Sequence, residues 1–227
     1  MALLTAVGED TFGERALRLW EAEGVDASAV LRVPAPTMAG AILVEPGGEN
    51  RIVIVPGALA ALEPRHVDAF APAIAAADVL LVQLEIPLAT ALHALRVGRQ
   101  ADVLCVLDPA PAPASPLAAE ADYLTPNERE AAAVAGSPGR LVLTLGERGA
   151  QLAEELVPAF PAEPVDTTGA GDAFAAAFAV ALAEGAGELE AARFACAAGA
   201  HMVEHHGVVP GLPTRAEREA RLHAQAR

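Results

Sequence analysis

Residues 165–174 read Val165-Asp166-Thr167-Thr168-Gly169-Ala170-Gly171-Asp172-Ala173-Phe174, a glycine turn that opens into an alanine-rich helix. The N-terminus of a helix has N–H groups without carbonyl partners and carries partial positive charge, so it can hold an anion. Glycine at two positions of the turn lets the backbone approach that anion closely. The stretch therefore predicts an anion site, with the carboxylate of Asp172 beside it.

An anion site next to a carboxylate suits phosphoryl transfer. The reaction needs N–H groups that stabilise phosphate charge and a base that takes a proton from the attacking hydroxyl. Asp172 is the candidate base. The candidate N–H groups are those of Gly169, Ala170, Gly171 and Asp172. The alternative is a plain glycine turn, in which Asp166 or Thr167 caps the helix and Asp172 is favoured only by the helix dipole.

The composition is that of one globular domain, residues 1–227, long enough to bury a sizeable core. Hydrophobic residues make up 53% of the chain but aromatic residues only 4%, so the core must consist of small aliphatic side chains. No apolar run is long enough to cross a membrane, and the segment after Met1 does not resemble a signal peptide. Cys105 and Cys196 stand in apolar surroundings, which favours buried free thiols and a cytoplasmic protein.

The formal net charge is −15, from 15 basic and 30 acidic residues. This excess argues against a surface that binds nucleic acid or an anionic membrane. The chain contains no lysine, which excludes a P-loop with its phosphate-binding lysine. A phosphate ligand must therefore be held by helix N-termini, backbone N–H groups and a bound cation.

Apolar runs of strand length alternate with helical stretches along the chain. The predicted strands are Leu3–Val7, Val79–Leu84, Val103–Leu107, Tyr123–Thr125 and Leu141–Leu145. The predicted helices are Phe12–Glu23, Pro64–Ala76, Leu88–Val97, Asn127–Val134, Gly171–Glu184, Leu189–His205 and Arg215–Ala226. This alternation predicts an α/β fold, a doubly wound and mostly parallel sheet with flanking helices, whose sites gather at the carboxyl ends of the strands.

Further short motifs follow one another in a fixed order. They are Val7-Gly8-Glu9-Asp10 with Phe12-Gly13, Gly48-Glu49-Asn50, Pro56-Gly57-Ala58, Gln83-Leu84-Glu85-Ile86-Pro87, Asp108-Pro109-Ala110-Pro111, Pro126-Asn127-Glu128-Arg129-Glu130 and Thr144-Leu145-Gly146-Glu147-Arg148-Gly149. Together with the glycine turn they make most of the chain resemble the ribokinase-like (PfkB-type) carbohydrate kinases. The resemblance implies a transferase that uses ATP to phosphorylate a hydroxyl of a small sugar, with Asp172 as base.

The resemblance also implies ligand sites. Thr144, Gly146, Gly149 and Gly207 would bind the nucleotide, and Glu85 would contact the sugar or a metal-bound water. The turn at 144–149 could equally be an ordinary hairpin.

Two cations, Mg²⁺ and K⁺, are implied as well. Asn127 and Glu130 share one helix face and would hold Mg²⁺ through water, although a capping box has the same spacing. Asp166 and the carbonyl of Thr168, with carbonyls from residues 203–207, would bind K⁺. Helix capping by Asp166 is the alternative.

Two extended segments, Thr37–Val44 and Arg51–Val55, flank turn residues at 46–50 and predict a hairpin. It is either a surface hairpin or, as the resemblance implies, a small lid over the sugar spanning about residues 37–55. Three positions depart from the family pattern: Met38 replaces a lid glycine, Leu59 an asparagine, and Asp108 a common asparagine.

Members of the family carry an earlier strand–helix unit with a Gly-Gly-Lys-Gly-Ala-Asn motif, whereas Met1 stands at the strand before Val7. We therefore expect an N-terminally incomplete domain, through truncation, a mis-assigned start or degeneration. The alternative function is a catalytically impaired nucleotide-binding protein of the same fold. An uncovered sheet edge would pair with another chain, so a homodimer or higher oligomer is expected, joined through the hairpin or that edge.

Overall fold

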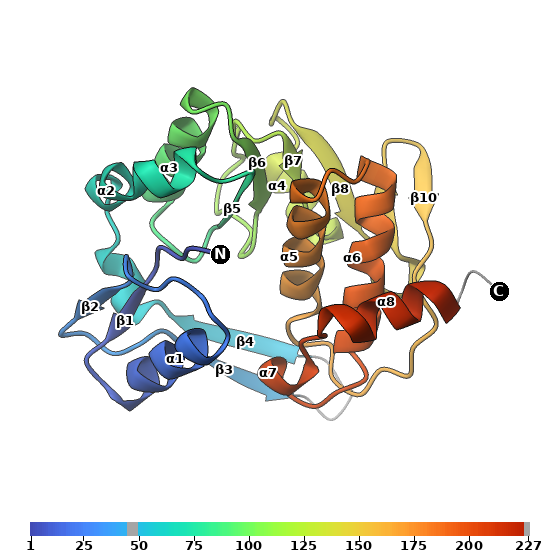
Figure 1. The fold of residues 1–227 in the computed structure, drawn as a ribbon, viewed down its shortest axis with the longest axis horizontal. Coiled ribbons are helices and arrows are strands. Elements are labelled where there is room, and N and C mark those ends of the chain that lie inside the picture. Colours follow the sequence, from blue (N-terminus) through green and yellow to red (C-terminus); the bar gives the residue numbers. More distant parts are fainter. Residues whose placement is uncertain (45–49, 225–227) are drawn as a thin grey trace. The chain divides into compact units, whose positions relative to one another are not determined.

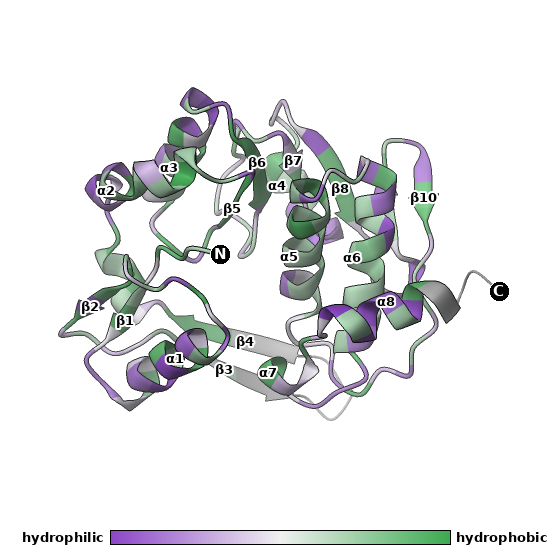
Figure 2. Cartoon of the chain, in the orientation of Figure 1, coloured by the Kyte–Doolittle hydropathy of each residue, from purple (hydrophilic) through white to green (hydrophobic). Residues whose placement is uncertain are grey.

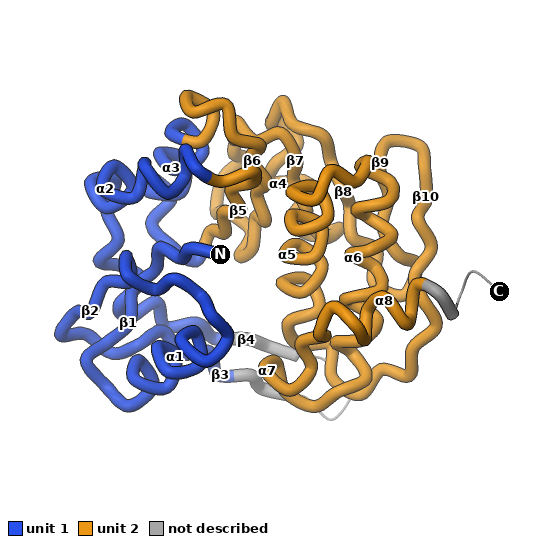
Figure 3. Tube along the Cα trace, viewed as in Figure 1, with its two compact units in different colours: residues 1–76, 85–97 blue, residues 77–84, 98–227 orange. Residues whose placement is uncertain are grey.

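The computed structural model describes residues 1–44 and 50–224, and Figure 1 shows the order of their helices and strands. The chain divides into two compact units (Figure 3). Unit 1 comprises residues 1–76 and 85–97, and unit 2 comprises residues 77–84 and 98–227. No helix in the described residues is both long enough and apolar enough to cross a membrane.

Unit 2 is built on a six-stranded sheet with the strand order β10-β9-β8-β7-β6-β5. The strands are β5 (Val79–Gln83), β6 (Leu104–Asp108), β7 (Tyr123–Leu124), β8 (Arg140–Thr144), β9 (Ala150–Leu152) and β10 (Glu155–Val157). The four strands from β5 to β8 are parallel, and β9 and β10 add an antiparallel edge. The predicted α/β fold with a mostly parallel sheet is confirmed.

Alanine-rich helices pack against one face of this sheet. The helices of unit 2 are α4 (Glu128–Val134), α5 (Ala170–Ala183), α6 (Glu188–Met202), α7 (Val208–Gly211) and α8 (Arg215–Ala224). The side chains of α5 and α6 share one core with residues of β6, β8, β9 and β10, and Figure 2 shows how apolar α5 is along its length. Tyr123 meets Phe178 edge to face in this core, at 5.3 Å between ring centroids. Small side chains thus build most of the core, as the composition predicts.

The described residues of unit 1 form two small sheets and three helices. Its elements are β1 (Ala6–Gly8), α1 (Thr11–Ala22), β2 (Leu31–Val33), β3 (Ala39–Val44), β4 (Asn50–Val55), a 3-10 turn (Gly57–Ala61), α2 (Pro64–Ala75) and the first ten residues of α3 (Leu88–Gln100). β3 and β4 pair antiparallel, and the turn predicted at 46–50 lies outside the described residues except for Asn50. Ala6, Ala58, Leu59 and Leu62 form the core of this unit.

Three short strands were not predicted from the sequence: β2, β9 and β10. Each has only three residues, too few for a period-2 pattern to stand out. Of the strand predicted at Leu3–Val7, only Ala6 and Val7 lie in β1, which is buried and parallel but pairs with β2 in a two-stranded sheet of its own. The helix predicted to end at His205 ends at Met202, and the last two residues of the predicted helix Arg215–Ala226 lie outside the described residues.

Candidate active site

Gly169 begins α5 in a left-handed conformation, with φ 80° and ψ 2°. A Cβ atom at this position would lie 2.9 Å from Met202 Cε and 3.2 Å from Val208 Cγ1. The carbonyl of Gly169 accepts the first bond of the helix, from the N–H of Ala173 at 2.9 Å. Both the backbone conformation and the close packing therefore require glycine here.

Gly171 differs, because nothing in the protein requires a glycine there. Apart from its chain neighbours and the adjoining backbone of α5, no heavy atom lies within 4 Å of the position of its missing Cβ. The N–H groups of Gly171 and Asp172 belong to the first helical turn, where no helix carbonyl can accept them. Open space beside Gly171 leaves room for an anion to approach this turn. The N–H of Ala170, predicted to join them, instead donates to Thr167 O at 3.3 Å.

Asp172 lies exposed in the first turn of α5, and its carboxylate contacts the sheet. Gln83 Nε2 donates to Asp172 Oδ1 at 2.7 Å and to Asp108 Oδ2 at 3.2 Å. Gln83 and Asp108 are paired in register as the last residues of β5 and β6. The candidate base is thus connected to the carboxyl edge of the sheet, where α/β proteins bind their ligands. The sequence analysis assigned Gln83 no role, although a polar residue ending an apolar strand is such a signal.

Asp166 ties the glycine turn to the loop after α6. Its Oδ1 accepts from the N–H of Thr168 and its Oδ2 from the N–H of Gly207, both at 3.0 Å. These bonds, the one from Thr168 foremost, lower the pKa of Asp166 to about 2. The N–H groups of Val165 and Asp166 both donate to Val203 O. The structure therefore brings the predicted K⁺ ligands and Gly207 together. The carboxylate of Asp166 stays ionised and has further lone pairs that could bind a cation.

Asn127 and Glu130 form a capping box at the start of α4, which is the alternative that the spacing allowed. Asn127 Oδ1 accepts from the N–H groups of Arg129 and Glu130, and Glu130 Oε2 accepts from the N–H of Asn127 at 2.9 Å. Within residues 1–44 and 50–224, no group of three or more His, Cys, Asp or Glu side chains could hold a metal ion. The oxygens of this pair fit Mg²⁺ only in company with water and phosphate oxygens.

A buried hydroxyl lies two residues before Asn127. Thr125 Oγ1 has no hydrogen-bond partner in the part of the chain that the structure describes, and its residue is 4% exposed. A buried polar atom without a partner is unusual, and water or a ligand at the carboxyl end of β7 would satisfy it. The surroundings of Asn127 therefore fit a hydrated ion.

The turn after β8 lies beside this helix start. Thr144 forms a parallel bridge with Asn127, and its N–H donates to Pro126 O at 2.9 Å. Gly146 and Gly149 both have positive φ, 59° and 101°. A Cβ on Gly149 would lie 2.1 Å from Val157 O, so glycine is required there by packing as well. The predicted nucleotide turn and the predicted magnesium pair are thus neighbours in the structure.

Two polar residues of the motifs, Glu85 and Asp10, belong to unit 1. Glu85 is half-buried in the segment that follows β5. Asp10 caps α1 by accepting from Gly13 N at 2.8 Å, and it also accepts from Thr37 N and Thr37 Oγ1, both at 2.7 Å. These bonds, led by that from Gly13, lower the pKa of Asp10 to about 2. Asp10 therefore holds Thr37, which precedes β3 and the β3–β4 hairpin.

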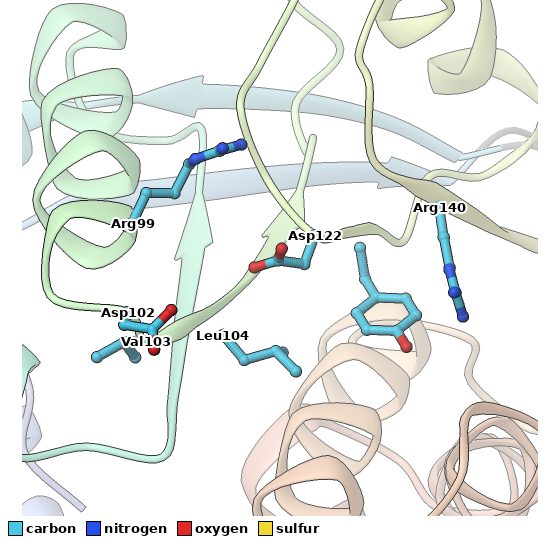
Figure 4. A pocket seen from close by; sticks show the side chains of 7 residues that line it. Arg99, Asp102, Val103, Leu104, Asp122 and Arg140 are labelled. Atoms are coloured by element: carbon cyan, nitrogen blue, oxygen red, sulfur yellow. The ribbon is translucent and has the colours of Figure 1, made fainter.

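A hollow of about 460 Å³ lies at the other edge of the sheet, at the amino ends of β6, β7 and β8 (Figure 4). Three of its charged side chains already have protein partners. Arg140 pairs with Glu188, Arg99 lies 3.7 Å from Glu120, and Asp122 accepts from Cys105 N at 2.7 Å. All the motif residues discussed above for unit 2 lie elsewhere, so this hollow is not the candidate active site.

Comparisons with known proteins identify the family of this chain. The family model described as pfkB family carbohydrate kinase matches residues 1–215. Ribokinase of Bacillus subtilis is 39% identical over 234 residues, covering 95% of this chain and 79% of that protein. Deoxyribokinase of Salmonella typhi is 32% identical over 217 residues, covering 84% and 71%.

Two solved structures show the same fold. Ribokinase of Thermotoga maritima superposes with a TM-score of 0.84 at 33% identity, covering 98% of this chain and 81% of that one. Arabidopsis thaliana ribokinase, complexed with ribose and ATP, gives a TM-score of 0.85 at 29% identity, covering 97% and 81%.

The fold and the site define a phosphotransferase that acts on an alcohol group of a sugar. The chain belongs to the pfkB family of carbohydrate kinases, and it catalyses the ATP-dependent phosphorylation of a small sugar. Nothing in the comparisons supports the alternative of a catalytically impaired protein.

Proposed function

We propose that the sugar is a pentose of the ribose or deoxyribose kind and that Asp172 is the base that activates its hydroxyl. The observation that carries the role of Asp172 is its place at the start of α5, next to the open space at Gly171. The choice of a pentose is supported by the relatives, which are named ribokinase and deoxyribokinase.

In the proposed reaction, the sugar oxygen attacks the terminal phosphorus of ATP as its proton passes to the carboxylate of Asp172. The bond between that phosphorus and the ADP oxygen breaks, and ADP leaves. The N–H groups of Gly171 and Asp172 stabilise the negative charge on the transferred phosphoryl group. The N–H of Gly169 is proposed to contribute as well, whereas that of Ala170 already donates to Thr167 O.

The nucleotide is proposed to lie along the turn with Thr144, Gly146 and Gly149 and to reach the loop at Gly207. Mg²⁺, when bound, neutralises phosphate charge; Asn127 and Glu130 would hold it through water. Asp166 and the carbonyl of Thr168 would hold K⁺, with carbonyls of residues 203–207. The ionised carboxylate of Asp166 supports this cation site.

Unit 1 is proposed to serve the sugar, through Glu85 and the lid formed by the hairpin at about residues 37–55. The hairpin is also the proposed contact of a homodimer. Val53, Ile54 and Val55 are 54%, 40% and 56% exposed, an apolar run that a second copy would cover. β5, at one end of the described six-stranded sheet, offers an alternative edge for pairing.

A cytoplasmic location is proposed from the cysteines. Cys105 and Cys196 are both buried thiols that form no disulfide in the described residues, and burial raises the pKa of these thiols to about 11 and about 12. Thiols held in this protonated state are inert, as expected of a protein kept in a reducing compartment.

The test is ADP release with a panel of pentoses, hexoses and nucleosides, with and without Mg²⁺ and K⁺. Asp172→Ala should lower kcat by about 10²–10⁴ because it removes general-base assistance. Asp78→Ala is the matched control, since Asp78 is exposed before the amino end of β5. Asp172→Ala with undiminished kcat would remove Asp172 as the base, and turnover of hexoses in preference to every pentose would refute the choice of sugar.

A further inference from the structure

The amide of Gln83 links two carboxylates at the carboxyl edge of the sheet. Its Nε2 lies 2.7 Å from Asp172 Oδ1 and 3.2 Å from Asp108 Oδ2. An amide nitrogen has two N–H donors, and these two contacts use both. Turning the amide by 180° would place its carbonyl oxygen against two carboxylates, acceptor against acceptor. The neighbours themselves therefore determine which way the amide points.

The two partners of Gln83 differ in how firmly they are held. Asp108 is 4% exposed and ends β6 in register with Gln83, so it belongs to the rigid sheet. Asp172 is exposed in the first turn of α5, where surrounding side chains do not restrict its rotamer as burial would. The bond from Gln83 therefore connects an exposed carboxylate to a buried support.

We propose that Gln83 is a positioning residue for the phosphoryl-transfer reaction and that Asp108 acts through it. Gln83 holds Asp172 Oδ1, so that Oδ2 is presented to the sugar hydroxyl, and Asp108 keeps the amide in the donating orientation. The inference rests on the proposed role of Asp172 as the base.

Asp108 has a defined part in this arrangement. Two carboxylates that reach the same nitrogen repel each other, and the two N–H groups between them offset the repulsion. An asparagine oxygen could accept the same bond from Gln83, so Asp108→Asn should keep most of the activity. Asp108→Leu removes the acceptor and should lower kcat as substitution of Gln83 does.

The first experiment is steady-state kinetics of Gln83→Met, a change that keeps the length of the side chain and removes both donors. Without the bond from Gln83, Asp172 is no longer held in position, so kcat should fall by about 10- to 100-fold with little change in KM for ATP or sugar. Gln83→Leu is the second variant if the first folds poorly. Gln151→Met is the matched control, because Gln151 lies in β9 of the same sheet and donates to Ala153 O instead.

The second experiment is a double-mutant cycle with Asp172→Ala. If Gln83 acts through Asp172, Gln83→Met should cause no further loss of kcat in the Asp172→Ala protein. Equal losses in both backgrounds would overturn the inference, since a structural effect of Gln83 does not depend on the base. Undiminished kcat in a stable Gln83→Met protein would overturn it too. Asp172→Ala with full activity would instead refute the base, and with it the premise of the inference.

Discussion

The two glycines of the α5 turn should respond to alanine in opposite ways. At Gly171 a methyl group meets no atom within 4 Å beyond its chain neighbours and the adjoining backbone of α5, and the residue is helical. Alanine is favoured over glycine in a helix by about 0.5–1 kcal/mol, so Gly171→Ala should not destabilise the protein. At most, this gain would raise the melting temperature by about 2–4 °C for a chain of this size.

If the transferred phosphoryl group occupies this space as proposed, the methyl group would keep it away from the N–H groups of the turn. A phosphoryl group that cannot reach one such donor should lose about as much as when the donor is removed, about 10²–10³ in kcat. We therefore expect Gly171→Ala to be as stable as the original protein but to release ADP at about a hundredth of the rate or less. Differential scanning calorimetry and a coupled ADP assay, run on the same preparation, measure the two quantities.

Gly169→Ala is the control for this experiment. Its left-handed backbone costs an alanine about 1–2 kcal/mol, and the methyl group would approach Met202 Cε to 2.9 Å. This variant should lose stability and activity together. If Gly171→Ala keeps both its stability and its kcat, no phosphoryl group passes through that space, and the proposed role of the turn is wrong.

Three further predictions concern the rest of the structure. Gly149→Ala should destabilise the protein strongly in urea unfolding, since its Cβ would lie 2.1 Å from Val157 O. A change in the free energy of unfolding of under about 0.5 kcal/mol, which is typical of surface sites, would contradict this prediction. Asp166→Asn should lose the stability that the lowered pKa of Asp166 provides. This stability is present above the unfolded pKa of 3.8 and disappears as the pH falls through about 2, so the free energies of unfolding of the two proteins should become equal in acid. A difference in stability that persists at low pH would exclude this cause. Val53→Arg should reduce the mass measured by light scattering at low micromolar concentration, while an original protein that is already monomeric would refute the dimer.

Local sequence was a reliable guide where an element is long and its pattern strong. The helix α5 was predicted within one residue at each end, because a glycine turn precedes it and an unbroken alanine-rich stretch follows. The strands β5, β6 and β8 were predicted within one residue for the same kind of reason, since each is a run of apolar residues. β9 and β10 were missed because three residues pair only when the neighbouring strand is already in place.

Single motifs left questions that local spacing could not answer. Asn127 and Glu130 have the spacing of a capping box and of a magnesium site, and the structure shows that the cap is formed. In the sequence, both glycines of the α5 turn suggest close approach by a ligand. Their different roles can be distinguished only from their surroundings in the structure. Gly169 is required by the protein's own packing, whereas Gly171 stands beside open space.

The sequence by itself determined the parallel α/β fold, the glycine turn and the identity of the candidate base. These follow from periodicity, from the conformational freedom of glycine and from the N–H groups that every helix start presents. Only the tertiary structure decided what supports that base. Gln83 and Asp172 are separated by 89 positions along the chain. Pairing of parallel strands brings Gln83 beside Asp108, and packing of α5 on the sheet then places Asp172 within reach of Gln83. Contacts between residues so far apart in the sequence depend on the whole fold, so no local pattern could predict them.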